Sequence, residues 1–113
     1  MASVNKLDLD AQNHTSAGAL AFNGSAQSIG ALYKSLIGFC KISSYSAGTL
    51  TCKIQHSCDA VNWVDLISFA AKSSNTFEIA YPTLDKCLGY VRATVTAPGA
   101  TNANVLVQLW FDK

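Results

Sequence analysis

The sequence predicts an all-β protein, an antiparallel β-sandwich of jelly-roll-like form with about seven or eight short strands. Short segments in which apolar and polar residues alternate recur along the chain, and polar or glycine- and proline-containing turns separate them. The only stretch with helical spacing carries internal glycines, so no long helix is expected. The 113 residues are enough for one domain with its own hydrophobic core.

The amino-terminal segment is polar, with leucines alternating with aspartates. Two alternatives stay open for it: an edge strand, or an arm that becomes ordered only against a partner. We divide the chain into an N-terminal arm at residues 1–16 and a β-sandwich domain at residues 17–113. The arm is the expected contact with a larger assembly, through backbone pairing with an exposed strand edge. Its candidate binding residues are Val4, Leu7 and Leu9.

The next two segments differ in how clearly they indicate strands. Residues 17–22 alternate small and large side chains, and Asn23-Gly24-Ser25 ends them as a turn. Residues 26–42 are ambiguous, because apolar residues recur at helical spacing around two glycines. We expect an irregular segment or a short helical turn to about Lys34, followed by a strand over residues 36–42.

A hairpin over residues 50–66 is the clearest local feature of the chain. Residues 49–56 alternate apolar and polar side chains, which is typical of a half-buried strand, and residues 63–69 form the returning strand. Asp59 lies in the connecting turn and is expected to accept hydrogen bonds from the backbone two residues on. Trp63 follows the turn, where a tryptophan most often anchors a sandwich core; the alternative is a platform on which a sugar stacks.

Three further strands complete the predicted fold. Residues 76–79 form a short strand, and residues 88–96 and 103–111 form longer ones. The last of these is apolar on both of its faces. A strand of this kind is either central in its sheet or part of an interface.

Composition excludes several classes of function. Only 13% of the residues are charged, against roughly 25% in a typical soluble domain. A surface with so few charges suits a protein that ends in an assembly. The net charge is +1 with no basic cluster, so direct binding to nucleic acid is not expected. No secretory signal or membrane-spanning apolar run is visible, and synthesis in the cytosol is expected.

The residues that could carry chemistry form no catalytic or metal-binding pattern. The four cysteines lack zinc-site spacing and are expected to be reduced, small buried hydrophobes. His56 near Cys58 is not enough to define a nucleophile and its base. The acidic residues around Asn62 do not match a calcium loop. We therefore expect no enzyme activity, no metal and no cofactor.

Several segments resemble a family of small virion proteins of tailed bacteriophages, the head decoration or cement proteins. Residues 49–57, with the Asp59, Asn62-Trp63 and Asp65-Leu66 that follow, are similar to their strand ending in Ile-Gln-x-Ser and their Asp-Gly-x-x-Trp turn. Gly89–Thr96 is similar to their Tyr-Val-Arg strand, and Leu7–Asp10 and Ser28–Gly30 also fit. Ala60 replaces the usual glycine, which puts the turn type in question because alanine disfavours a positive φ.

The resemblance implies a β-sandwich on the outside of an icosahedral head that joins neighbouring capsid subunits and resists internal DNA pressure. The implied partners are the major capsid protein and further copies of the same chain, as a trimer or a dimer. Two other functions stay open at this point. The chain could be a tail or head–tail connector component of the virion, or a glycan-binding module that uses Trp63.

Overall fold

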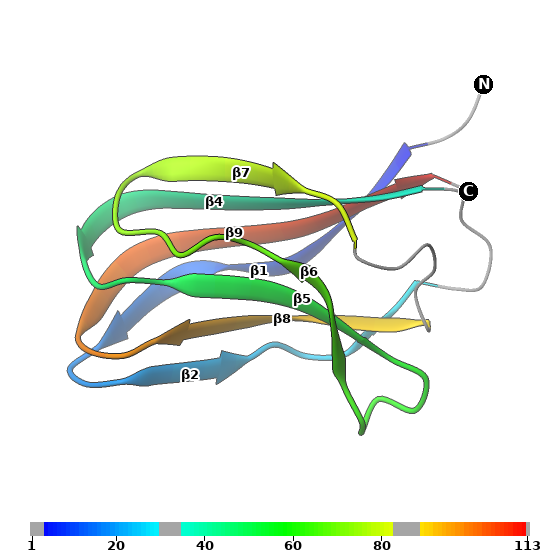
Figure 1. Ribbon diagram of the computed structural model, residues 1–113, viewed down its shortest axis with the longest axis horizontal. Coiled ribbons are helices and arrows are strands. Elements are labelled where there is room, and N and C mark those ends of the chain that lie inside the picture. Colours follow the sequence, from blue (N-terminus) through cyan, green and yellow to red (C-terminus); the bar gives the residue numbers. More distant parts are fainter. Residues whose placement is uncertain (1–3, 30–34, 83–88, 113) are drawn as a thin grey trace.

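The protein is a sandwich of two antiparallel β-sheets, as predicted (Figure 1). The computed structural model describes residues 4–29, 35–82 and 89–112. Nine strands lie in these ranges: β1 (Val4–Ser16), β2 (Leu20–Asn23), β3 (Gln27–Ser28), β4 (Ser35–Ala47), β5 (Thr51–Ser57), β6 (Val64–Ser68), β7 (Thr76–Ala80), β8 (Tyr90–Ala97) and β9 (Thr101–Asp112). No helix in the described ranges is long and apolar enough to cross a lipid bilayer.

The first sheet has the strand order β1-β9-β4-β7 and includes most of the predicted arm. β1 pairs with β9 along its whole length, from Val4 opposite Asp112 to Ser16 opposite Thr101, with one register shift between Asp8 and Asp10. Of the two alternatives for this segment, the structure therefore has the edge strand. Residues 4–16 are part of the sandwich, and the remainder of the predicted arm lies outside the described residues.

The second sheet has the order β2-β8-β5-β6, and the two-residue strand β3 also pairs with β8. The predicted hairpin is present as β5 and β6, with Ile54 opposite Ile67 and His56 opposite Val64. β3 falls in the segment for which a helical turn was one expectation. Residues 30–34 lie outside the described residues, so that expectation is not tested there.

The core fills the space between the two sheets and follows the two-residue period of the strands. On β4, alternate residues from Leu36 to Ile42 are buried. Gly38 belongs to this inner row, and a glycine fits there because the second sheet comes very close at that point. A β-carbon on Gly38 would lie 2.9 Å from Ile67 Cδ1 and 2.9 Å from Phe69 Cζ. The central β9 is the strand predicted to be central or interfacial, and it lies between β1 and β4.

Candidate functional site

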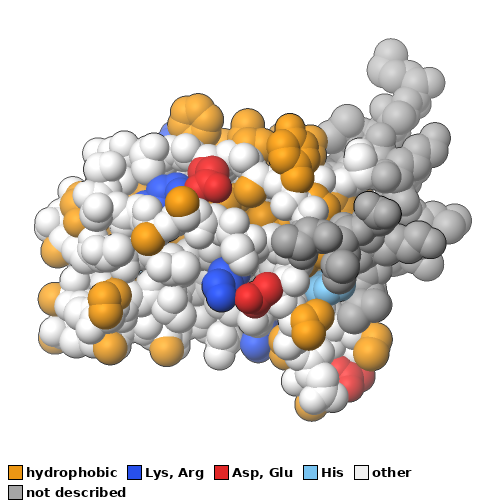
Figure 2. Space-filling model, viewed as in Figure 1, with side chains coloured by type: hydrophobic (Ala, Val, Ile, Leu, Met, Phe, Trp, Pro, Cys, Tyr) orange, Lys and Arg blue, Asp and Glu red, His pale blue; other side chains and the backbone are white. Residues whose placement is uncertain are grey.

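The outer side of the first sheet carries a continuous apolar surface over β9, β4 and β7. Strand register places Trp110 opposite Ile37, and Phe39 between Gln108 and Ile79. The side chains at its β7 end are the most exposed, with 62% of Phe77, 53% of Ile79 and 70% of Tyr81 accessible. We call this surface the apolar face and define it by Ile37, Phe39, Phe77, Ile79, Tyr81, Leu106 and Trp110. It forms much of the upper edge of the molecule in Figure 2.

Contacts within the sheet hold the apolar face in one shape. The rings of Phe39 and Phe77 stack with centroids 6.0 Å apart. Gln108 is almost fully buried among these side chains, and its amide donates to Asp8 Oδ1 at 2.7 Å. The Trp110 indole donates to Gln108 Oε1 at 3.2 Å. A shallow hollow of about 350 Å³ lies between Ile37, Phe39, Ile79, Gln108 and Trp110.

Few charges approach this face, and they lie at defined places. Lys41 on β4 lies between Phe77 on β7 and Leu106 on β9. At the β1 side, Lys6 lies 3.9 Å from Asp8 Oδ1 and its ammonium is 5.8 Å from the centre of the Trp110 ring. Among the described residues, the face is therefore an apolar centre with one cation in it and an ion pair at its rim.

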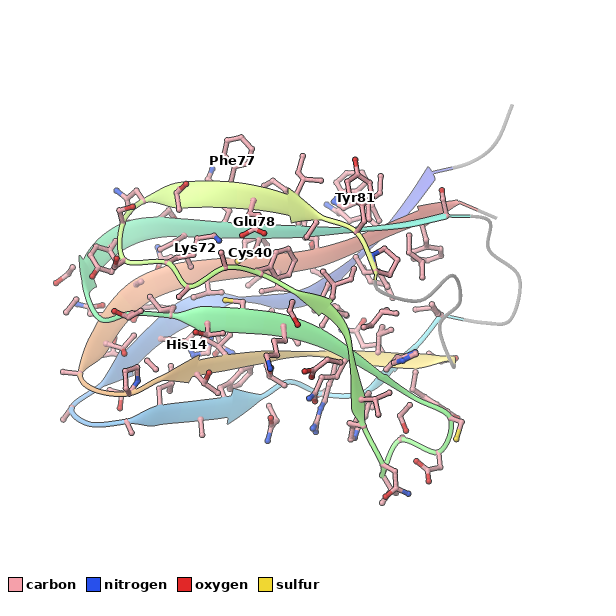
Figure 3. The ribbon with its side chains drawn as sticks, viewed as in Figure 1. His14, Cys40, Lys72, Phe77, Glu78 and Tyr81 are labelled. Carbon is pink, nitrogen blue, oxygen red and sulfur yellow. The ribbon has the colours of Figure 1, made fainter. Side chains whose placement is uncertain are left out.

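An ion pair between the buried Lys72 and the partly exposed Glu78 anchors β7, the edge strand of the apolar face, from the inner side (Figure 3). The Lys72 ammonium is only 6% exposed and donates to the Glu78 carboxylate and to the Ala70 carbonyl. The Ala70 N–H donates to Glu78 Oε1 at 2.9 Å. Lys72 also forms a β-bridge with Leu50. The sequence offers no signal for this pair, because the two residues are separated by a polar loop.

The outer side of the second sheet is mainly polar, although Tyr90 on β8 is also exposed, and it carries a chain of side-chain contacts. The Lys53 ammonium lies 3.1 Å from Asp65, and the Gln55 amide donates to Asp65 at 3.0 Å. These bonds, from Gln55 first and from Lys53, hold the pKa of Asp65 below its usual value. Arg92 Nε donates to Gln55 Oε1, and the Arg92 guanidinium lies 4.4 Å from the centre of the Trp63 ring.

Trp63 is therefore not the core anchor that the sequence predicted. It lies outside the buried core cluster and is only half-buried. The reason is that β6 begins at Val64, so Trp63 precedes the strand and stacks against Arg92 from β8. One face of the indole ring is covered by the guanidinium, which also leaves less of it free to stack on a sugar.

Asp59 organises the turn of the hairpin, as predicted. Its Oδ1 accepts the N–H groups of Val61 and Asn62 at 2.9 and 2.8 Å, and its Oδ2 accepts the Asn62 amide. These bonds to the charged carboxylate hold the pKa of Asp59 well below its usual value. Ala60 has φ = 61°, the left-handed conformation for which the related pattern uses glycine. All of these bonds lie within the turn, which indicates a structural role.

The predicted contact residues of the amino-terminal segment do not form a surface. Leu9 is 5% exposed and belongs to the core; it is the extra residue at the register shift between Asp8 and Asp10. Leu7 lies opposite the buried Leu109 and packs against the same core. The side chain of Val4 lies outside the described residues. The residues that the sequence singled out for contact are thus core residues where they are described.

The interior holds two further polar pairs. His14 Nε2 lies 2.6 Å from Asp10 Oδ2, and both side chains are buried. The His14 ring packs edge-to-face against Phe22. The thiols of Cys40 and Cys52 contact each other across the core; their hydrogen bond lowers the pKa of Cys40 and, with burial, raises that of Cys52. The expectation of buried cysteines is confirmed for these two, whereas Cys58 is exposed and Cys87 lies outside the described residues. Within the described ranges, no three His, Cys, Asp or Glu side chains gather as metal ligands would.

Comparison with known proteins identifies a shared fold. No protein-family model matches the chain, and no curated protein matches its sequence. A chain in the structure of infectious bursal disease virus, Gx strain, is similar over 100% of this chain and 32% of its own length, with a TM-score of 0.61 and 14% identity. This chain thus spans about a third of that viral chain. PirA (12% identity, 97% and 93% covered) and the SPBc2 prophage-derived protein YomS (11% identity, 100% and 96% covered) each give a TM-score of 0.48. At these identities the likeness concerns the fold alone.

Proposed function

We propose that this chain is a structural protein of a bacteriophage particle, a decoration or cement protein on the outside of the head. In this role it binds the major capsid protein and stabilises the contacts between capsid subunits. It is made in the host cytoplasm and acts as a homo-oligomer, a trimer or a dimer, without a cofactor and without enzyme activity.

The observation that carries the proposal is the apolar face. An apolar surface of this extent is as large as the largest patch on a typical monomeric protein, and such patches are often functional. Permanent assemblies bury faces of this kind, since their interfaces are more apolar than those of transient complexes. The low overall charge of the chain points the same way.

Two other observations support a virus particle as the assembly. The whole chain has the fold of part of a chain from a virus structure, with a TM-score of 0.61. The Ile-Gln-x-Ser hairpin and the Tyr-Val-Arg strand resemble those of phage decoration proteins. Binding in many copies to a capsid lattice would make weak individual contacts effective.

The test is to purify particles of the phage that encodes this chain through a density gradient and to count the chain by quantitative mass spectrometry. A decoration protein is expected in a number comparable to the major capsid protein, on the order of hundreds of copies. About a dozen copies or fewer would instead indicate the second candidate, a ring-shaped tail or head–tail connector component. Absence of the chain from purified particles would contradict both.

A cryo-EM map of the same particles would then place the chain. Density for the sandwich on the outer surface of the head, between capsid subunits, is the expected result. A glycan-binding role is the remaining alternative. It requires binding to a glycan array that is lost in a folded Trp63→Ala variant, and the Arg92 stack on Trp63 disfavours it.

A further inference from the structure

We infer that the apolar face is the surface through which two copies of this chain associate, each covering the other's Phe77, Ile79 and Trp110. This inference deepens the proposed function, on which the expectation of a homo-oligomer rests. It places the contact between copies on the outer side of β9, β4 and β7.

The size of the apolar face fits one interface. Aromatic side chains offer about 150–250 Å² each when fully exposed. With Phe77, Ile79, Tyr81 and Trp110 between 37% and 70% exposed, and the other three half-buried, the face presents roughly 500–600 Å². Its polar rim extends this toward the ~800 Å² that each partner contributes to a standard interface.

The composition of the face is that of an interface centre with a polar rim. The middle of the face consists largely of phenylalanine, tyrosine and tryptophan, which are enriched in protein interfaces. The centres of homodimer interfaces are more apolar than those of other complexes. The Lys6–Asp8 pair and the row of Asn13 and Asn104 lie beyond it on the β1 side. Phe39, Gln108 and Trp110 are held in place by stacking and hydrogen bonds, so little ordering is needed on association.

The structure favours a second copy of the chain as the occupant of the apolar face. The face includes β7, which is an edge strand. Its exposed apolar side chains would promote aggregation if they were left uncovered. Another copy of the same chain is present wherever the chain is made. Two-fold contact places an apolar centre on an apolar centre. It also offers Lys41 of each copy a carboxylate from the other, since Asp8 lies on the same side of the sheet.

The experiment compares two variants of the full chain, Ile79→Glu and Val64→Glu. Both positions are β-branched, 53% exposed and located on an edge strand, but Val64 belongs to β6 in the other sheet. Sedimentation velocity from about 1 to 100 µM should give the wild type twice the 12.0 kDa mass of one chain. Ile79→Glu should weaken association by about 30-fold or more, because it places a carboxylate in the apolar centre. Val64→Glu should associate as the wild type does.

Circular dichroism and thermal unfolding show that each variant is folded, and Phe77→Ser provides a second, uncharged disruption of the same face. A wild type that stays monomeric at 100 µM, or an Ile79→Glu variant that keeps its mass, overturns the inference. So does dissociation by Val64→Glu. A monomeric wild type that needs Ile79 to bind phage heads would assign the face to the capsid instead. The particle count tests the proposed function separately, since a dimer that depends on Ile79 can exist in a protein absent from particles.

Discussion

The two outer surfaces of the sandwich have the same backbone architecture and opposite chemistry. On the first sheet, β4, β7 and β9 present the apolar face, with four large apolar side chains more than a third exposed. On the second sheet, β5, β6 and β8 present Lys53, Gln55, Asp65 and Arg92, which are joined by hydrogen bonds. Arg92 also covers one face of the Trp63 ring. A solvent-facing sheet surface is ordinarily polar, as the second sheet is. The first sheet departs from that pattern, which is why we assign association to it.

The largest expected difference in the free energy of unfolding is between two lysine–carboxylate pairs. Lys72–Glu78 lies on the inner side of the first sheet, and Lys53–Asp65 lies on the outer side of the second. Glu78→Ala should destabilise the protein by about 3 kcal/mol, because it leaves the buried Lys72 ammonium without its counter-ion. Asp65→Ala removes the exposed pair with Lys53 and should cost about 0.5 kcal/mol. Urea unfolding of both variants measures the difference. Equal losses would mean that β7 is not anchored through Glu78.

The close packing of the first sheet against the second at Gly38 predicts the next largest loss of stability. Gly38→Val should cost about 2 kcal/mol, because the added side chain meets Ile67 and Phe69 at less than contact distance. Gly18→Ala is the matched control: nothing lies within 4 Å of its β-carbon position, and a change within about 0.5 kcal/mol is expected. Thermal unfolding compares them. A Gly38→Val variant of wild-type stability would show that the sheets separate easily beneath the apolar face.

The pH dependence of stability should trace to the second sheet. Burial lowers the pKa of His56 on β5, so the unfolded chain binds a proton at a pH where the folded protein does not. Stability is then unaffected above the unfolded pKa of about 6.5 and falls as the pH drops below it. Asp59 and Asp65, whose pKa values are lowered, lose their contributions only below about pH 4.

Urea unfolding at about pH 7.5, 6.5 and 5.5 measures this dependence. His56→Gln removes the titrating group and should flatten it. If the variant loses as much stability as the wild type over this range, the group responsible lies elsewhere in the molecule.

The smallest expected difference in the free energy of unfolding is between the two cation–aromatic contacts, Arg92 with Trp63 and Lys6 with Trp110. Arg92→Ala should cost about 1 kcal/mol, because it removes both the stack on Trp63 at 4.4 Å and the hydrogen bond to Gln55. Lys6→Ala on the apolar side removes a longer contact to Trp110, at 5.8 Å, from an exposed side chain and should cost at most about 0.5 kcal/mol. Chemical denaturation compares them. A reversed order would show that the rim of the apolar face depends on Lys6 more than the geometry indicates.

The sequence by itself determined the local features, because these depend on short-range periodicity and turn chemistry. The two-residue alternation around Ile54 placed the hairpin, and Asp59 could be assigned to the turn since its bonds reach only two and three residues along the chain. The last strand was correctly expected to be central or interfacial from its two apolar faces. The sequence does not distinguish strand from arm for the amino-terminal segment, because its pairing partner β9 lies about a hundred residues away.

Only the tertiary structure determined which side chains form the outer surfaces of the two sheets. Phe77 and Ile79 alternate with Glu78 as core residues would, yet they face outward because β7 turns Glu78 inward to meet Lys72. Trp63 lies outside the core because it precedes β6, and there it packs against Arg92 from β8. Alternation along a strand defines two sides but does not say which of them is covered; that depends on which strands come to lie beside it and on what packs against the sheet.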